Sequence, residues 1–162
     1  NAAMWLDAGA AQVIVTSHIF RDGVLYMDCL KKLFQITGRD RLTLDLSCRR
    51  SRDGAFYIVT DRWQKFTSLR VEAETLRLLA DYCTEFLIHA VDVEGKQSGI
   101  DRELVRLLAE SSPIDCVYAG GISTLAEIDD IEALGGGKVH YTVGSALDLF
   151  GGKLKYADIL RR

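Results

Sequence analysis

The strongest constraint on this chain is an alternation of strand-like and helix-like runs along its whole length. The strand-like runs are rich in Val, Ile, Leu and Tyr, and several are apolar at consecutive positions, as expected of strands buried on both faces. They occupy residues 12–17, 41–47, 85–92, 115–121 and 139–145. Apolar residues at helical spacing fill the intervals at 26–38, 72–83, 101–112 and 124–137. Repeated units of this kind predict a parallel sheet covered by helices.

Two folds contain such repeats, the doubly wound sheet and the (β/α)8 TIM barrel. A doubly wound dinucleotide fold favours a GxGxxG turn after its first strand, and the sequence has none. A complete barrel takes about 250 residues, whereas this chain has 162. The sequence therefore predicts an α/β fold in which residues 1–162 form the C-terminal portion of a single TIM-barrel domain, about the last five βα units. The start, "NAAMWLDAGA", lacks a methionine at position 1 and reads as the inside of a helix, so we expect a longer polypeptide.

The interval after the second strand-like run is longer than the others and reads "CRRSRDGAFYIVTDRWQKFTSL". It contains an "RDG" turn signal followed by the strand-like "AFYIVT", which predicts a small hairpin. Long loops in compact domains are often functional. In a barrel the loop after a strand lies at the C-terminal face, where active sites form.

Composition excludes several classes of protein. The net charge is −3, and positive residues are dispersed apart from the cluster Arg49, Arg50 and Arg52, so no nucleic-acid partner is expected. No apolar run reaches the ~18 residues that a membrane span needs. The four cysteines form no CxxC pair, which favours reduced core thiols over a zinc or redox site. We therefore expect no metal, no membrane and a soluble intracellular protein.

Polar and glycine residues gather at the ends of the strand-like runs, and in a barrel these positions share one mouth. "AGGIS" and "VGSAL" place Gly120, Gly121, Gly144 and Ser145 after two successive strands, with a short helix expected to start near Ser145. Glycines there let backbone N–H groups approach an anion, commonly a phosphate. The alternative is that each pair only makes a tight turn.

Three side chains near this mouth are candidates for chemistry. Asp45 lies inside an apolar strand, where a carboxylate needs a partner or a purpose; it either caps the next turn or donates a proton. His89 is either a hydrogen-bonded core histidine or a site residue. Trp63, in the predicted hairpin, either packs on its own hairpin or forms a lid over a planar ring.

The motifs "LTLDLSCR", "TDRWQKF", "EFLIHAVDVEGKQSGID", "VYAGGIS" and "TVGSALDLFGG" together resemble one family over essentially the whole chain. It is the eukaryotic, plant-like form of phosphoribosylformimino-5-aminoimidazole carboxamide ribotide isomerase, which acts in histidine biosynthesis. The resemblance implies a TIM barrel that binds a substrate with a phosphate at each end. It also implies an Amadori rearrangement from an aminoaldose to an aminoketose, with no cofactor.

The resemblance implies roles for particular residues. Asp45 matches the general acid that opens the ribose ring, and Trp63 matches the loop tryptophan that closes over the substrate. Gly120, Gly121, Gly144 and Ser145 match one phosphate site, and Thr16 and Ser17 match part of the other. Arg49, Arg62 and His89 are expected near the substrate. Ala90 departs from the threonine of bacterial members, which removes a hydroxyl from the site.

The resemblance also implies a missing part, because the general base and the rest of the second phosphate site belong to the absent N-terminal half-barrel. That half, or another chain, is expected to cover the cut edges of the sheet. Two alternatives remain: the related imidazole glycerol phosphate synthase cyclase, and a non-catalytic barrel fragment in a larger assembly. The expected compartment is the plastid stroma for a plant or algal source and otherwise the cytoplasm.

Overall fold

The computed structural model describes residues 1–96 and 98–162 and is built around a parallel sheet. In spatial order, its five strands are β1 (Val13–Val15), β4 (Leu42–Asp45), β8 (Glu85–His89), β9 (Cys116–Ala119) and β10 (Val139–Thr142). Every neighbouring pair is parallel, so the predicted parallel α/β fold is confirmed. Each strand lies beside its successor in the chain. A doubly wound sheet instead reverses its strand order at a switch point, so this order fits part of a barrel.

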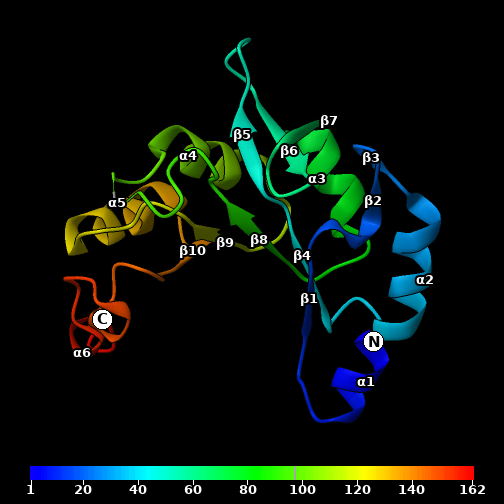
Figure 1. Ribbon diagram of the computed structural model, residues 1–162, viewed down its shortest axis with the longest axis horizontal. Coiled ribbons are helices and arrows are strands. Elements are labelled where there is room, and N and C mark those ends of the chain that lie inside the picture. The colour runs from blue at the N-terminus through cyan, green and yellow to red at the C-terminus, as the bar shows by residue number, and fades with distance from the viewer. Residues whose placement is uncertain (97) are drawn as a thin grey trace.

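One main helix connects each successive pair of strands, as the alternation predicted. These helices are α2 (Met27–Thr37), α3 (Ala73–Ala80), α4 (Arg102–Ser111) and α5 (Leu125–Gly135). Figure 1 shows α3, α4 and α5 following one another along the upper side of the sheet, with α2 beside β1. Right-handed crossovers in a constant direction place successive helices on one side of a sheet. The remaining helical segments are short: α1 (Ala2–Asp7), η1 (Ser17–Ile19), η2 (Asp148–Phe150) and α6 (Tyr156–Ile159).

The ends of the main helices follow from their sequence. Helix α2 stops at Gly38, whose φ of 70° is readily reached without a side chain. The Asp101 carboxylate accepts a hydrogen bond from the Leu104 amide at 3.1 Å and caps α4. Thr124 and Glu127 form a capping box at the start of α5. These local contacts fix where each helix begins after the strand that precedes it.

Two antiparallel elements rise from the carboxyl ends of β1 and β4. The predicted hairpin is present as β5 (Cys48–Arg50) and β6 (Phe56–Thr60), and β7 (Lys65–Arg70) adds a third strand that was not predicted. A second small hairpin, β2 (Phe20–Arg21) and β3 (Val24–Leu25), was also not predicted. The two elements are in contact, since Lys65 of β7 forms an ion pair at 3.8 Å with Asp22, in the turn between β2 and β3. Together they stand over the same edge of the main sheet.

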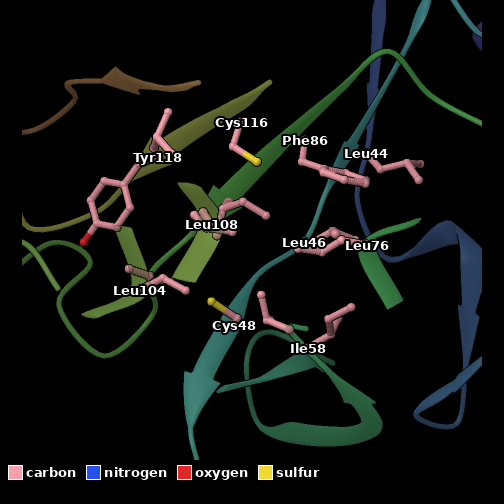
Figure 2. Close-up of a cluster of buried hydrophobic side chains, with 14 of the residues drawn as sticks. Leu44, Leu46, Cys48, Ile58, Leu76, Phe86, Leu104, Leu108, Cys116 and Tyr118 are labelled. Carbon is pink, nitrogen blue, oxygen red and sulfur yellow. The ribbon is translucent and has the colours of Figure 1, made fainter. Parts of the chain in front are cut away.

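The hydrophobic core lies between the sheet and its helices and extends under the three-stranded hairpin sheet (Figure 2). Phe86 and Tyr118 are the largest fully buried side chains of the central strands. Ile58 of β6 is also buried in this core, so the hairpin sheet is anchored rather than loosely attached. Burial raises the pKa of Cys116 to about 11, which keeps this thiol protonated at neutral pH. The four cysteines are free, in agreement with the prediction of core thiols for the three that are buried.

Within the described part of the chain, no helix has the length and apolar character that crossing a bilayer demands.

Candidate active site

A cavity of about 430 Å³ opens at the carboxyl ends of β1, β4 and β8, below the turn between β6 and β7. Thr16 and Ser17 enter it from β1, Asp45 from β4 and His89 from β8. Trp63 closes it from the hairpin side. The remaining lining residues are Phe20, Ser47, Ile58, Val59, Thr60, Asp61 and Arg62. Parallel pairing thus brings together Thr16, Ser17, Asp45 and His89, which the sequence had separated by up to 73 positions, and the hairpin adds Trp63.

Asp45 and His89 form the polar centre of this cavity. The Asp45 Oδ1 atom lies 2.9 Å from the His89 Nδ1 atom. Asp45 is only 8% exposed, while the histidine ring is about one quarter exposed. The hydrogen bond to Asp45 raises the pKa of His89 above its ordinary value of 6.5, and burial opposes that change only in part. The two alternatives proposed for His89 therefore coincide, because it is a hydrogen-bonded histidine that also faces the cavity.

Trp63 is held over the larger cavity by an unusual turn. Asp61, Arg62 and Trp63 all have left-handed backbones, with φ of 52°, 55° and 69°. Non-glycine residues seldom adopt this conformation, and such residues cluster at functional sites. The Trp63 indole N–H donates a hydrogen bond to the Ser47 hydroxyl at 3.1 Å, and 42% of the side chain stays exposed. The ring is thus tethered near Asp45 rather than packed down on its own hairpin.

A second cavity of about 200 Å³ adjoins the first, and His89 lines both. The four residues that the sequence assigned to a phosphate site, Gly120, Gly121, Gly144 and Ser145, all line it. The other lining residues are Glu94, Gly95, Ala119, Ile122 and Thr142. The structure therefore brings the two predicted glycine turns together at one pocket.

The two glycines after β9 are also required by packing. Gly120 and Gly121 have φ of 126° and 74°. A Cβ atom on Gly121 would lie 2.1 Å from the carbonyl oxygen of Gly99, and one on Gly120 would lie 2.9 Å from that of Ala90. The loop after β8 therefore folds directly over this turn. By contrast, a Cβ atom on Gly144 would meet nothing within 4 Å.

The second cavity offers backbone donors but little positive charge. No acceptor among residues 1–96 and 98–162 receives a hydrogen bond from the amides of Gly120, Gly121 or Ile122. Glu94 adds a carboxylate to the wall, so an anion here would depend on amide dipoles. The helix expected near Ser145 is not formed, because the chain makes only the short η2 turn, starting at Asp148. Its place is taken by a turn in which the Leu147 amide donates to the Gly144 carbonyl.

Arg49 is outside the residues that line the two cavities. Its guanidinium Nε donates to the Asp92 carboxylate at 3.1 Å. Arg62, in contrast, lines the larger cavity beside Trp63. The sequence placed both arginines near the expected substrate, whereas in the structure only Arg62 lines a cavity.

Sequence reasoning missed several lining residues, of which Ser47 and Thr60 are the most informative. Ser47 lies two positions after Asp45, and that spacing places it on the same side of the chain. Thr60 is buried, and its hydroxyl has no hydrogen-bond partner within the described part of the protein. No sequence signal marked Thr60, because its position depends on how the hairpin folds back over the sheet.

No group of three or more His, Cys, Asp or Glu side chains within the described residues is arranged to hold a metal ion.

The geometry defines a class of protein: a parallel α/β domain with two adjoining cavities at the carboxyl edge of its sheet. Residues 1–155 match the family model described as "Histidine biosynthesis protein", and the chain belongs to this family. The resemblance seen in the sequence is therefore confirmed at the level of the family.

Several relatives have names that describe imidazole-4-carboxamide isomerases with two phosphoribosyl groups in the substrate. A chloroplastic one from Medicago truncatula is 48% identical over 160 residues, covering 99% of this chain and 51% of the relative. One from Neurospora crassa is 44% identical, covering 94% of this chain and 60% of the relative. One from Saccharomyces cerevisiae is 42% identical, covering 99% and 64%. The chain thus spans about half to two thirds of the length of these relatives.

The Asp45–His89 contact predicts a pH dependence of stability. Because the folded pKa of His89 is raised above its unfolded value of 6.5, its stabilising contribution is complete below pH 6.5 and is lost as pH rises through the folded pKa. In Asp45→Asn the pKa of His89 should fall, so the free energy of unfolding should decrease less as the pH rises above 6.5. NMR titration of the imidazole and urea unfolding at several pH values measure the two effects. An unchanged His89 pKa in the variant would contradict this account of the pair.

Proposed function

We propose that this chain supplies the C-terminal part of the active site of a histidine-biosynthesis isomerase. The reaction is an Amadori rearrangement of a bis-phosphorylated aminoimidazole carboxamide ribotide. The observation that carries the proposal is that the two cavities adjoin. Asp45 in the larger cavity is hydrogen-bonded to His89, which also lines the second cavity, called here the glycine cavity. The names of the relatives support the choice of reaction, and no cofactor is required for it.

Asp45 is the proposed general acid for ring opening. A proton passes to the ribose ring oxygen while the bond from C1 to that oxygen breaks and the C1–N bond becomes double. The hydrogen bond to Asp45 raises the pKa of His89, so this imidazole keeps its proton to higher pH than a free imidazole would. The pair, rather than Asp45 alone, is thus the proposed source of the proton, with Asp45 placed to deliver it.

The glycine cavity is the proposed site for one terminal phosphate. Its support is the set of undonated amides at Gly120, Gly121 and Ile122, together with the open space beside Gly144. Thr16 and Ser17, across the larger cavity, are the proposed contribution to the second phosphate site. Holding both ends of a long substrate would fix the sugar between them, beside Asp45. Trp63 would then cover the planar imidazole.

The rearrangement also needs a base to remove the C2 proton, and we propose that it comes from a part of the polypeptide outside this chain. That part would continue the sheet at β1 and β10, the two outer strands, and close a (β/α)8 barrel. Ile14 of β1 is 59% exposed, which favours such a neighbour. The same exposed strand would suit a partner chain if the fragment were a non-catalytic subunit. For a plant source the plastid is the proposed compartment, as in the Medicago relative.

Full-length protein should isomerise the ribotide, whereas this chain alone should not, because the base and half of the phosphate contacts are absent from it. Adding the N-terminal part as a separate polypeptide should restore turnover. A spectrophotometric assay of the ketose product measures the effect. Turnover by the chain alone would contradict the proposal that the base lies outside it. An inactive full-length protein would favour the alternative that the fragment is a non-catalytic subunit.

Asp45→Asn in the full-length protein should lower kcat by about 10²- to 10⁴-fold, the usual contribution of a general acid. The amide retains the shape of the carboxyl group but cannot relay the proton. Asp53→Asn, on an exposed hairpin turn, is the matched control and should retain activity. Turnover near that of wild type in Asp45→Asn would remove this residue from the mechanism.

Two glycine variants separate packing from phosphate binding. Gly144→Ala should fold normally, because its Cβ meets no protein atom, yet it should raise KM by narrowing the cavity. Gly121→Ala should lower the free energy of unfolding by more than about 1 kcal/mol, because its φ is positive and its Cβ would overlap Gly99. Thermal unfolding and steady-state kinetics measure both. An unchanged KM in Gly144→Ala would contradict close approach of a phosphate at this turn.

A further inference from the structure

Arg49 and Asp92 line neither of the two cavities, but each is bonded to, or close in sequence to, residues that do. We propose that this ion pair, which we call the latch, consists of two positioning residues. Arg49 holds Trp63 over the larger cavity, and Asp92 fixes the start of the loop after β8, which forms a wall of the smaller cavity. The kinetic part of this inference rests on the proposed isomerase function. The structural part does not, because it concerns contacts within the protein.

Asp92 uses both carboxylate oxygens to hold β5. One oxygen accepts a hydrogen bond from Arg49 Nε at 3.1 Å. The other accepts from the backbone N–H of Arg50 at 2.9 Å. One side chain from the end of β8 therefore fixes both a side chain and the backbone of the first hairpin strand.

Arg49 extends this link to the lid. Its Nη1 atom donates to the Trp63 carbonyl oxygen at 3.4 Å. Its guanidinium carbon lies 5.6 Å from the centroid of the Phe66 ring, on β7. The planar fork of an arginine can bind in two directions at once, which a lysine cannot do as well. The turn that carries Trp63 is thus connected directly to the β8 loop.

The opposite end of the latch leads to the second cavity. Asp92 precedes Glu94 and Gly95, which line that cavity. The carboxylate of Glu94 approaches the position that a Cβ atom on Gly120 would occupy, at 3.3 Å. A shift of Asp92 would therefore move the wall opposite the glycine turn. The latch therefore couples the position of Trp63 over the larger cavity to the position of the Glu94 wall of the smaller one.

The pair has little to contribute to overall stability. Both side chains are more than one third exposed, and ion pairs of this kind stabilise proteins only weakly. Strand β5 also has an independent contact with the segment after β8, because the Val91 amide donates to the Cys48 carbonyl at 3.1 Å. Removing the ion pair should therefore leave the fold intact while the Trp63 turn loses its position. This separates the latch from a purely structural salt bridge.

The test uses full-length protein labelled with 5-fluorotryptophan, with the Trp63 signal assigned from Trp63→Phe. In Arg49→Met and Asp92→Asn, the ¹⁹F signal of Trp63 should shift and show a larger solvent isotope effect between H₂O and D₂O. Arg52→Met is the matched control, since Arg52 lies on the same hairpin, is exposed and forms no hydrogen bond or ion pair with the other described residues. Its Trp63 signal should match that of wild type.

Kinetics on the ribotide give the second readout. Each latch variant should raise KM on the order of tenfold, with a smaller change in kcat, because a misplaced lid weakens positioning. The double variant should resemble the single variants, as residues acting as one unit do. A Trp63 signal and a KM equal to those of Arg52→Met would overturn the proposal. If the full-length protein lacked isomerase activity, the proposed function would fail, and the ¹⁹F comparison would still decide on the latch.

Discussion

Parallel pairing of five strands in chain order is the constraint on which the rest of this structure depends. Because the strands run in one direction, their carboxyl ends meet at one edge of the sheet, and side chains from distant parts of the sequence become neighbours there. Both cavities lie at that edge. Without this register, Asp45 and His89 would be two isolated polar residues in apolar strands. With it, they become a hydrogen-bonded pair whose histidine lines both cavities.

The second cavity shows how one residue type can serve two purposes. Gly121 is needed because the loop after β8 lies against it, and it also lines the second cavity with an amide that donates to no other described residue. Gly144 has no such packing reason. The two glycine turns looked equivalent in the sequence, yet only one of them is explained by the protein's own packing. The chemistry of a bound anion is therefore best examined at Gly144.

Much of the fold was predictable from the sequence, because it depends on local patterns. Consecutive apolar residues marked the five strands, and apolar residues at helical spacing over 124–137 marked α5, whose start is fixed by contacts between Thr124 and Glu127, three residues apart. The hairpin at β5 and β6 followed from its "RDG" turn. Strand β7 was missed because its sequence, "KFTSLR", lacks a buried stripe and pairs only through β6. The family was also recognisable from its motifs, and the family match confirms it.

The sequence alone determined the alternation of elements, the helix ends and the positions of polar residues after strands, since each is set by neighbours a few residues away. Tertiary structure decided which of those residues face a cavity and which bind each other. Arg49 and Arg62 illustrate the difference: both lie in the segment between β4 and α3, yet one pairs with Asp92, which follows β8, and the other lines the larger cavity. Asp92 lies 43 residues from Arg49, and the cavity that Arg62 lines includes Thr16 and His89, which lie 46 and 27 residues from it along the chain. Such contacts exist only after the strands pair, because the folding of the sheet is what brings those segments within reach.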